Sequence, residues 1–170
     1  PTLVQNGAVL NSGNSYTATG PFSAGIAYLQ TGKCGLNGDE CTTVEMTLVN
    51  PTAPGAGSST DITLIAPHAF NKGVGFRYFN GCDGQGQTCA TADCTDAFRT
   101  PTDYFAQTQC EENNVSRLSV YLYNAHTSLL KGRPHDHLLL SANCFKRMFI
   151  SPPFGYTVWV LGILLYSVET

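Results

Sequence analysis

Apolar and polar residues alternate in short runs through the first two thirds of the chain. Residues 43–48 read Thr-Val-Glu-Met-Thr-Leu, and residues 61–64 read Asp-Ile-Thr-Leu. A period of two is the pattern of a β-strand that buries one of its faces. Both segments are therefore predicted to be strands whose polar residues face away from the core. The residues predicted to point inward are Val44, Met46, Leu48, Ile62 and Leu64.

Further short segments have β-prone composition and end at turn residues. Residues 25–31 lead into a Gly-Lys-Cys-Gly turn, and residues 75–79 form an aromatic run before a polar, cysteine-rich loop. No long segment of residues 1–115 has the period of an amphipathic helix. Several short strands separated by turns predict an all-β fold, an antiparallel β-sandwich.

Composition narrows the class of protein and its partners. The chain has 170 residues, which suits one domain, and only 12% of them are charged. Abundant turn residues and few charges are typical of extracellular β-proteins. The formal net charge is −3, and Lys and Arg nowhere cluster. A nucleic-acid partner is not expected, because phosphate binding needs a concentrated basic surface.

Cysteine usage predicts disulfides and a secreted, extracellular protein. Six of the seven cysteines precede residue 111 and lie in polar turns, where reduced thiols are unusual. Their spacing is not that of a metal site, so neither a metal nor a cofactor is expected. Cys144 is the odd cysteine, and His135 and His137 are predicted to lie in a solvated loop.

The character of the chain changes near residue 116. Acidic residues outnumber basic ones ten to four up to Val115, whereas from Ser116 onwards basic residues outnumber acidic ones five to two. We expect one domain over residues 1–123 and an atypical tail over 124–170. Residues 154–168 form an uncharged apolar stretch, shorter than the ~20 residues of a membrane-spanning helix.

The series of segments resembles the thaumatin-like proteins, in particular a short secreted type from wood-rotting fungi sometimes labelled glycopeptides. Glu45 to Leu48 stands for the family's Glu-Phe-Thr-Leu, and Asp61 to Leu64 for its Asp-Val-Ser-Leu. The resemblance covers roughly residues 1–115, in the family's order. The other residues that carry it are segments 11–17, 25–28 and 70–71, then Cys34, Cys82, Cys89, Cys94 and Thr100-Pro101.

The resemblance implies a β-sandwich with disulfide-bonded loops. The implied pairs are Cys34–Cys41, Cys82–Cys110 and Cys89–Cys94. Relatives also join their first and last strands by a disulfide. The first of those cysteines would fall just before Pro1, and residues 118–123 stand where the second strand ends. We therefore expect an open sandwich edge.

The family has no counterpart of residues 124–170, and three interpretations are open. The first is translated non-coding sequence, such as a retained intron, because the composition changes where the family's last strand should finish. The second is a C-terminal lipid-anchor signal, with small residues at 141–143 and the apolar stretch behind them. Only this interpretation implies a membrane. The third is an extension packed on the sandwich.

Larger thaumatin-like proteins carry an acidic cleft tied to antifungal activity and β-1,3-glucan binding. Glu45 matches its Glu and Asp61 its first Asp. The second Asp falls near Ala66, and the Arg near Gln30 or Thr31, so both are missing; the last Asp has no counterpart. If their strands pair, Glu45 and Asp61 should leave the same sheet face.

Three functions follow as expectations. The first is a carbohydrate-binding or antifungal protein that uses Glu45, Asp61 and an aromatic platform. The second is an immunomodulatory protein, recognised by a host receptor without glycan chemistry. The third is a weak endo-β-1,3-glucanase. Candidate platform residues are Tyr28, Phe76, Tyr78 and Tyr104, and Asn114 begins an N-glycosylation sequon.

Overall fold

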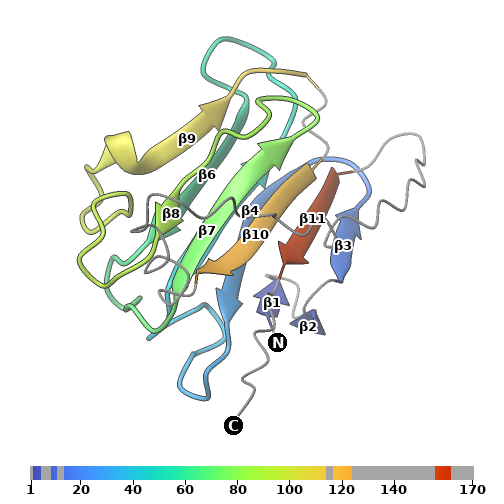
Figure 1. Cartoon of the computed structure of the whole chain (residues 1–170). Helices are drawn as coiled ribbons and strands as arrows, with labels where there is room; N and C mark the ends of the chain where they lie inside the picture. The colour runs from blue at the N-terminus through green and yellow to red at the C-terminus, as the bar shows by residue number, and fades with distance from the viewer. Residues whose placement is uncertain (1, 5–8, 11–13, 114–116, 124–155, 162–170) are drawn as a thin grey trace, which may run out of the picture.

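The computed structural model of the chain describes residues 2–4, 9–10, 14–113, 117–123 and 156–161 (Figure 1). These residues form β-strands in two sheets, and the one helical element among them is a short 3-10 turn, η1. Sheet A has the strand order β2-β1-β4-β5-β6-β9, and sheet B has the order β3-β11-β10-β7-β8. The elements are β1 Thr2–Val4, β2 Val9–Leu10, β3 Ser15–Ala18, β4 Phe22–Leu29, β5 Thr43–Leu48, β6 Ser58–Thr63, β7 Gly73–Phe79, β8 Thr88–Cys89, η1 Tyr104–Ala106, β9 Gln107–Cys110, β10 Arg117–Tyr123 and β11 Tyr156–Leu161.

Neighbouring strands in both sheets run antiparallel, apart from the parallel pair β10 and β11. The all-β, mainly antiparallel class expected from the alternating pattern is therefore confirmed. In sheet A, β4, β5 and β6 follow one another both in sequence and in space.

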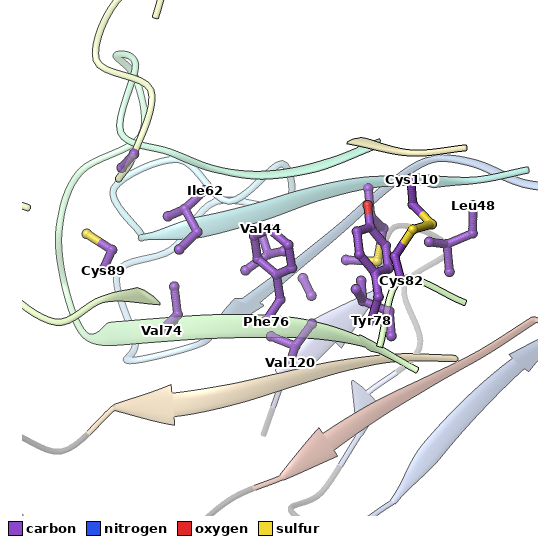
Figure 2. Close-up of a cluster of buried hydrophobic side chains, with 14 residues drawn as sticks. Val44, Leu48, Ile62, Val74, Phe76, Tyr78, Cys82, Cys89, Cys110 and Val120 are labelled. Carbon is purple, nitrogen blue, oxygen red and sulfur yellow. A yellow bond between two sulfur atoms is a disulfide. The ribbon is translucent and has the colours of Figure 1, made fainter. Parts of the chain in front are cut away.

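The core lies between the two sheets (Figure 2). Val44 and Ile62 of sheet A belong to one buried cluster with Phe76 and Val120 of sheet B, and each is at most 4% exposed. Burying apolar area of this kind is the main favourable contribution to folding, at about 25 cal/mol per Å². Each strand must therefore turn its apolar residues inward, which sends the alternate residues outward.

The predicted inward residues are confirmed. Val44, Met46 and Leu48 are at most 2% exposed, and Ile62 is fully buried. Leu64, just beyond the end of β6, is partly buried and packs against the same cluster.

Strand boundaries differ from the prediction at β6, which begins at Ser58, before the alternating segment 61–64. The Ser58 hydroxyl accepts a hydrogen bond from the Val49 amide and donates one to the Val49 carbonyl, both at 3.0 Å. These bonds satisfy the backbone groups of Val49, just past the end of β5. The buried Ser58 hydroxyl thus replaces the next backbone–backbone hydrogen bonds between β5 and β6. Side-chain pairing of this kind leaves no trace in the alternation of apolar residues.

All three implied disulfides are present in the structure: Cys34–Cys41, Cys82–Cys110 and Cys89–Cys94. Cys82 follows β7 of sheet B and Cys110 ends β9 of sheet A, so this bond joins the two sheets across the core (Figure 2). Three disulfides suggest an oxidising environment, as outside the cell.

Part of the segment predicted to be a tail lies in sheet B. Tyr156–Leu161 forms β11, which pairs with β10 on one side and β3 on the other. Strand β10, whose outer edge was expected to be open, thus has a neighbour on each side. The domain boundary at residue 123 stays a prediction, and Asn114, His135, His137 and Cys144 lie outside the described residues.

Replacing Cys82 and Cys110 by alanine should destabilise the protein more than replacing Cys89 and Cys94. The first bond spans 28 residues and the second five. Loop entropy then gives losses of about 3.5 and about 2 kcal/mol in the free energy of unfolding. Urea unfolding of the two double variants measures the difference. Equal losses would show that strain or residual structure outweighs loop length.

Candidate functional site

The two carboxylates singled out from the sequence face each other across neighbouring strands. Glu45 on β5 is the register partner of Asp61 on β6, and Asp61 in turn is the partner of Gln107 on β9. Directly opposed residues of an antiparallel pair have Cβ atoms about 4.5–5.5 Å apart. Because Val44 and Ile62 point into the core, these three side chains leave the opposite, outer face of sheet A. We call Glu45, Asp61 and Gln107 the polar row.

A second set of polar residues lies next to the polar row, two positions along each strand. Thr47, Ser59 and Gln109 are register partners on β5, β6 and β9. The Gln109 amide donates to the Gln107 side-chain oxygen at 3.1 Å, which ties the two sets together. The outer face of sheet A over these three strands is therefore rich in hydrogen-bonding groups and contains two carboxyl groups.

The two carboxyl groups have different environments. The Glu45 side chain is 48% exposed, whereas Asp61 lies between β5 and β9 and is only partly exposed. Burial, with a smaller contribution from the negative charge of Glu45, raises the pKa of Asp61 to about 7. At neutral pH, Asp61 is therefore present both as a carboxylic acid and as a carboxylate. The sequence showed that the two could be neighbours but carried no sign of this desolvation.

A histidine completes this part of the surface, and sequence reasoning missed it. His68 lies in the connection between β6 and β7, with its Nε2 atom 4.0 Å from the Glu45 Oε1 atom. Its Nδ1 atom lies 3.0 Å from the Gly38 carbonyl oxygen and 3.2 Å from the Thr43 hydroxyl. Only the resemblance offered a signal for this residue. It places the second Asp of the acidic cleft near Ala66, two residues before His68.

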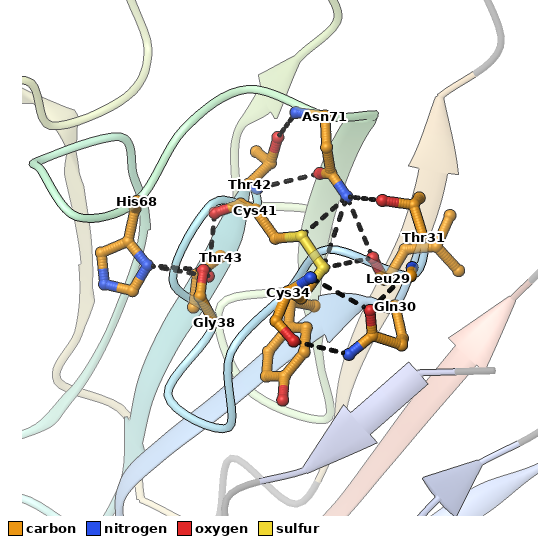
Figure 3. The surroundings of a disulfide bond; sticks show 12 residues. Leu29, Gln30, Thr31, Cys34, Gly38, Cys41, Thr42, Thr43, His68 and Asn71 are labelled. Atoms are coloured by element: carbon orange, nitrogen blue, oxygen red, sulfur yellow. Dashed lines mark hydrogen bonds between the residues drawn. A yellow bond between two sulfur atoms is a disulfide. The ribbon is translucent and has the colours of Figure 1, made fainter.

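The loop between β4 and β5, whose Gly38 carbonyl contacts His68, is anchored by a disulfide and by Asn71 (Figure 3). The Cys34–Cys41 bond closes the loop between β4 and β5. The Asn71 amide donates to the Leu29 carbonyl at 3.0 Å and to Cys41 Sγ at 3.0 Å, and its oxygen accepts from the Thr42 amide at 2.9 Å. One side chain thereby joins the end of β4, the loop and the start of β5.

Gly38 is the point where this loop comes closest to the sheet. Its φ of +81° is a conformation that favours glycine, and a side chain there would collide with Thr43 Oγ1. This close approach places the Gly38 carbonyl within hydrogen-bonding distance of His68. The position of the imidazole beside Glu45 thus depends on a backbone conformation 30 residues away in sequence.

The aromatic platform predicted from the sequence is mostly buried. Tyr28, Phe76 and Tyr78 are at most 2% exposed, so they offer no face to a ligand. Phe76 and Tyr78 point into the core from β7, and burial raises the pKa of Tyr78 to about 12. Tyr28 packs near Gly38 and donates its hydroxyl hydrogen to the Leu36 carbonyl. An aromatic run predicts a strand but does not show which of its side chains are buried, and these three are.

Tyr104 is the one predicted platform residue on the surface. It is 71% exposed, and its neighbour Phe105, which the sequence analysis did not single out, is 73% exposed. Both lie in η1, directly before β9 and within three residues of Gln107. The Asp103 carboxylate accepts hydrogen bonds from the Arg99 and Thr100 amides, both at 2.9 Å, and so orders the loop before them.

Other features of the described residues do not add to this site. No group of three or more His, Cys, Asp and Glu residues among them is arranged to hold a metal ion. No helix in this part of the chain is long and apolar enough to cross a membrane. A shallow depression lined by residues 51–55 and Glu111 lies at the turn between β5 and β6. There, the Glu111 carboxylate accepts from the Gly55 and Gly57 amides, which is a structural role.

Comparison with protein-family models, with curated proteins and with solved structures finds no match to this chain.

Asp61 should make the protein less stable as the pH rises. The folded state holds its proton more tightly than the unfolded chain, whose Asp pKa is near 3.8. Ionising Asp61 between about pH 4 and about pH 7 therefore costs free energy of folding. Relative to wild type, Asp61→Asn should be near neutral at about pH 4 and stabilising by about 1–3 kcal/mol at about pH 8, measured by urea unfolding.

Glu45→Gln provides the control for this effect. Without the Glu45 charge the Asp61 pKa falls, so the pH-dependent loss of stability should shift to lower pH. An Asp61→Asn difference that does not change with pH would contradict the raised pKa.

Proposed function

We propose that this chain is a secreted thaumatin-like protein that binds cell-wall β-1,3-glucan on the outer face of sheet A. The observation that carries the proposal is the pairing of Glu45 with Asp61, the two residues that match the family's acidic cleft. The two-sheet all-β architecture and the three disulfides agree with this family. Family membership and ligand both remain part of the proposal.

The chemistry of the polar row suits a polyhydroxylated ligand. Each sugar hydroxyl can donate one hydrogen bond and accept two, so a binding surface needs acceptors and donors side by side. Glu45 supplies carboxylate acceptors, and Asp61 supplies either function near neutral pH. Amide groups of Gln107 and Gln109 add both functions at the β9 edge. Bonds to charged groups are the stronger ones, at about 1.5–3 kcal/mol each.

The exposed aromatic pair lies next to the polar row in sequence. Tyr104 and Phe105 immediately precede β9, whose first residue belongs to the polar row. An exposed aromatic ring offers an apolar face to the C–H side of a sugar ring, and the Tyr104 hydroxyl adds a polar edge. In this proposal, a glucan chain lying across the strands meets the carboxyl groups over β5 and β6, and the aromatic rings that precede β9 offer a second contact.

Hydrolysis is the second candidate, and one observation favours it. Asp61 retains its proton up to about pH 7 beside the exposed Glu45, which is the division of roles between acid and base in glycosidases. A weak endo-β-1,3-glucanase would release reducing sugar from a soluble β-1,3-glucan such as laminarin. That release should then disappear in either single variant, Glu45→Gln or Asp61→Asn.

Wild-type protein should be retained on insoluble β-1,3-glucan, and the double variant Glu45→Gln/Asp61→Asn should bind at least about tenfold more weakly. Pull-down at several protein concentrations, with competition by laminarin, measures this loss. A double variant with Asp96→Asn and Glu112→Gln removes two carboxyl groups from exposed positions outside the polar row and serves as the control.

Two results would count against the proposal. If wild-type protein is not retained on the glucan at any pH tested, glucan binding is wrong, and the alternative of a protein recognised by a host receptor gains weight. If both double variants lose binding equally, net charge and not the polar row is responsible.

A further inference from the structure

The contacts of His68 determine which of its ring nitrogens carries hydrogen. Nδ1 lies 3.0 Å from the Gly38 carbonyl oxygen, which can only accept a hydrogen bond. Its other neighbour, the Thr43 hydroxyl at 3.2 Å, lies within reach of the Gly38 and Cys41 carbonyls and can donate to either. Nδ1 must therefore be protonated in both charge states of the ring. Proton gain and loss are confined to Nε2.

Nε2 is the atom that faces the polar row. It lies 4.0 Å from the Glu45 Oε1 atom, which is too far for a direct hydrogen bond. A separation of this size between two polar atoms is bridged well by a third group between them. An oxygen about 2.8 Å from both atoms would form a triangle with an angle near a right angle at the oxygen, which is open enough for two hydrogen bonds.

The charged surroundings of His68 are mainly acidic. The loop around Gly38 contributes Asp39 and Glu40, β5 contributes Glu45, and β6 contributes Asp61. Tyr28 lies beneath the loop, near Gly38. The cations of the two loops, Lys33 and Lys72, are solvent-exposed.

We infer that His68 is a ligand-contacting residue of this surface, whose Nε2–H donates to the same sugar hydroxyl that donates to Glu45. The inference rests on the proposed carbohydrate binding. It adds a donor to a pair of groups that, as carboxylates, can only accept. Since the donor exists only while Nε2 is protonated, this contact strengthens as the pH falls, through a group different from Asp61.

Two substitutions separate the ligand contact from the structural role of the ring. In His68→Asn, the side-chain amide can keep the hydrogen bond to the Gly38 carbonyl but places nothing at Nε2. In His68→Gln, the amide nitrogen can reach the Nε2 position and donate at every pH, while the bond to Gly38 is lost. Thermal unfolding of both variants reports the structural role alone.

Binding to β-1,3-glucan is then measured for wild type and both variants at a series of pH values between about 5 and about 8. His68→Asn should bind about tenfold more weakly than wild type at the acidic end, with the difference shrinking toward the alkaline end. His68→Gln should approach wild-type affinity at the acidic end and exceed it at the alkaline end. In Glu45→Gln, the added His68→Asn substitution should have a smaller effect.

The outcomes distinguish this inference from the function on which it rests. Wild-type binding that His68→Asn leaves unchanged at every pH overturns the role of His68 alone, whereas absence of wild-type binding overturns both. Nitrogen chemical shifts of the imidazole, assigned by comparison with His68→Asn, test the first step without ligand. Neutral His68 in the Nε2–H form would overturn the inference by itself.

Discussion

Each of the two sheets must bury an apolar face, and the packing of these faces against each other decides where the remaining side chains point. Val44 and Ile62 meet Phe76 and Val120 in the core. Because successive residues of a strand face opposite sides, burying Val44 and Ile62 sends their neighbours Glu45 and Asp61 outward. The antiparallel register then sets these two directly opposite each other. The candidate site is therefore a direct consequence of the core.

The two carboxyl groups have different environments although both lie on inner strands of sheet A. Asp61 lies on β6, which has β5 on one side and β9 on the other, so neighbouring side chains flank it from both. Glu45 also lies on an inner strand, but its side chain is about half exposed. Desolvation contributes more than the nearby charge to the raised pKa of Asp61. Near neutral pH the polar row can thus combine acceptor and donor functions.

The position of His68 depends on contacts between segments that are distant in sequence. The Cys34–Cys41 bond and the hydrogen bonds of Asn71 hold the loop over the end of sheet A. The positive φ of Gly38 then brings its carbonyl to the imidazole. These contacts restrict the ring to one orientation, so that its second nitrogen faces the polar row. A preorganised surface loses little entropy when it binds a ligand.

Local pattern by itself predicted strands that overlap β4, β5, β6 and β7, the inward residues of β5 and β6, and the all-β class, because a period of two is a local property. The resemblance added the three disulfide pairs and the likeness of Glu45 and Asp61 to an acidic cleft. Exposure and desolvation were decided only by the tertiary structure, since they depend on what packs over a residue. Tyr28, Phe76 and Tyr78 proved buried, Phe105 exposed, and the Asp61 pKa raised for this reason. His68 could be recognised as a candidate site residue only from the structure, because folding brings Gly38, Thr43 and Glu45 around its imidazole.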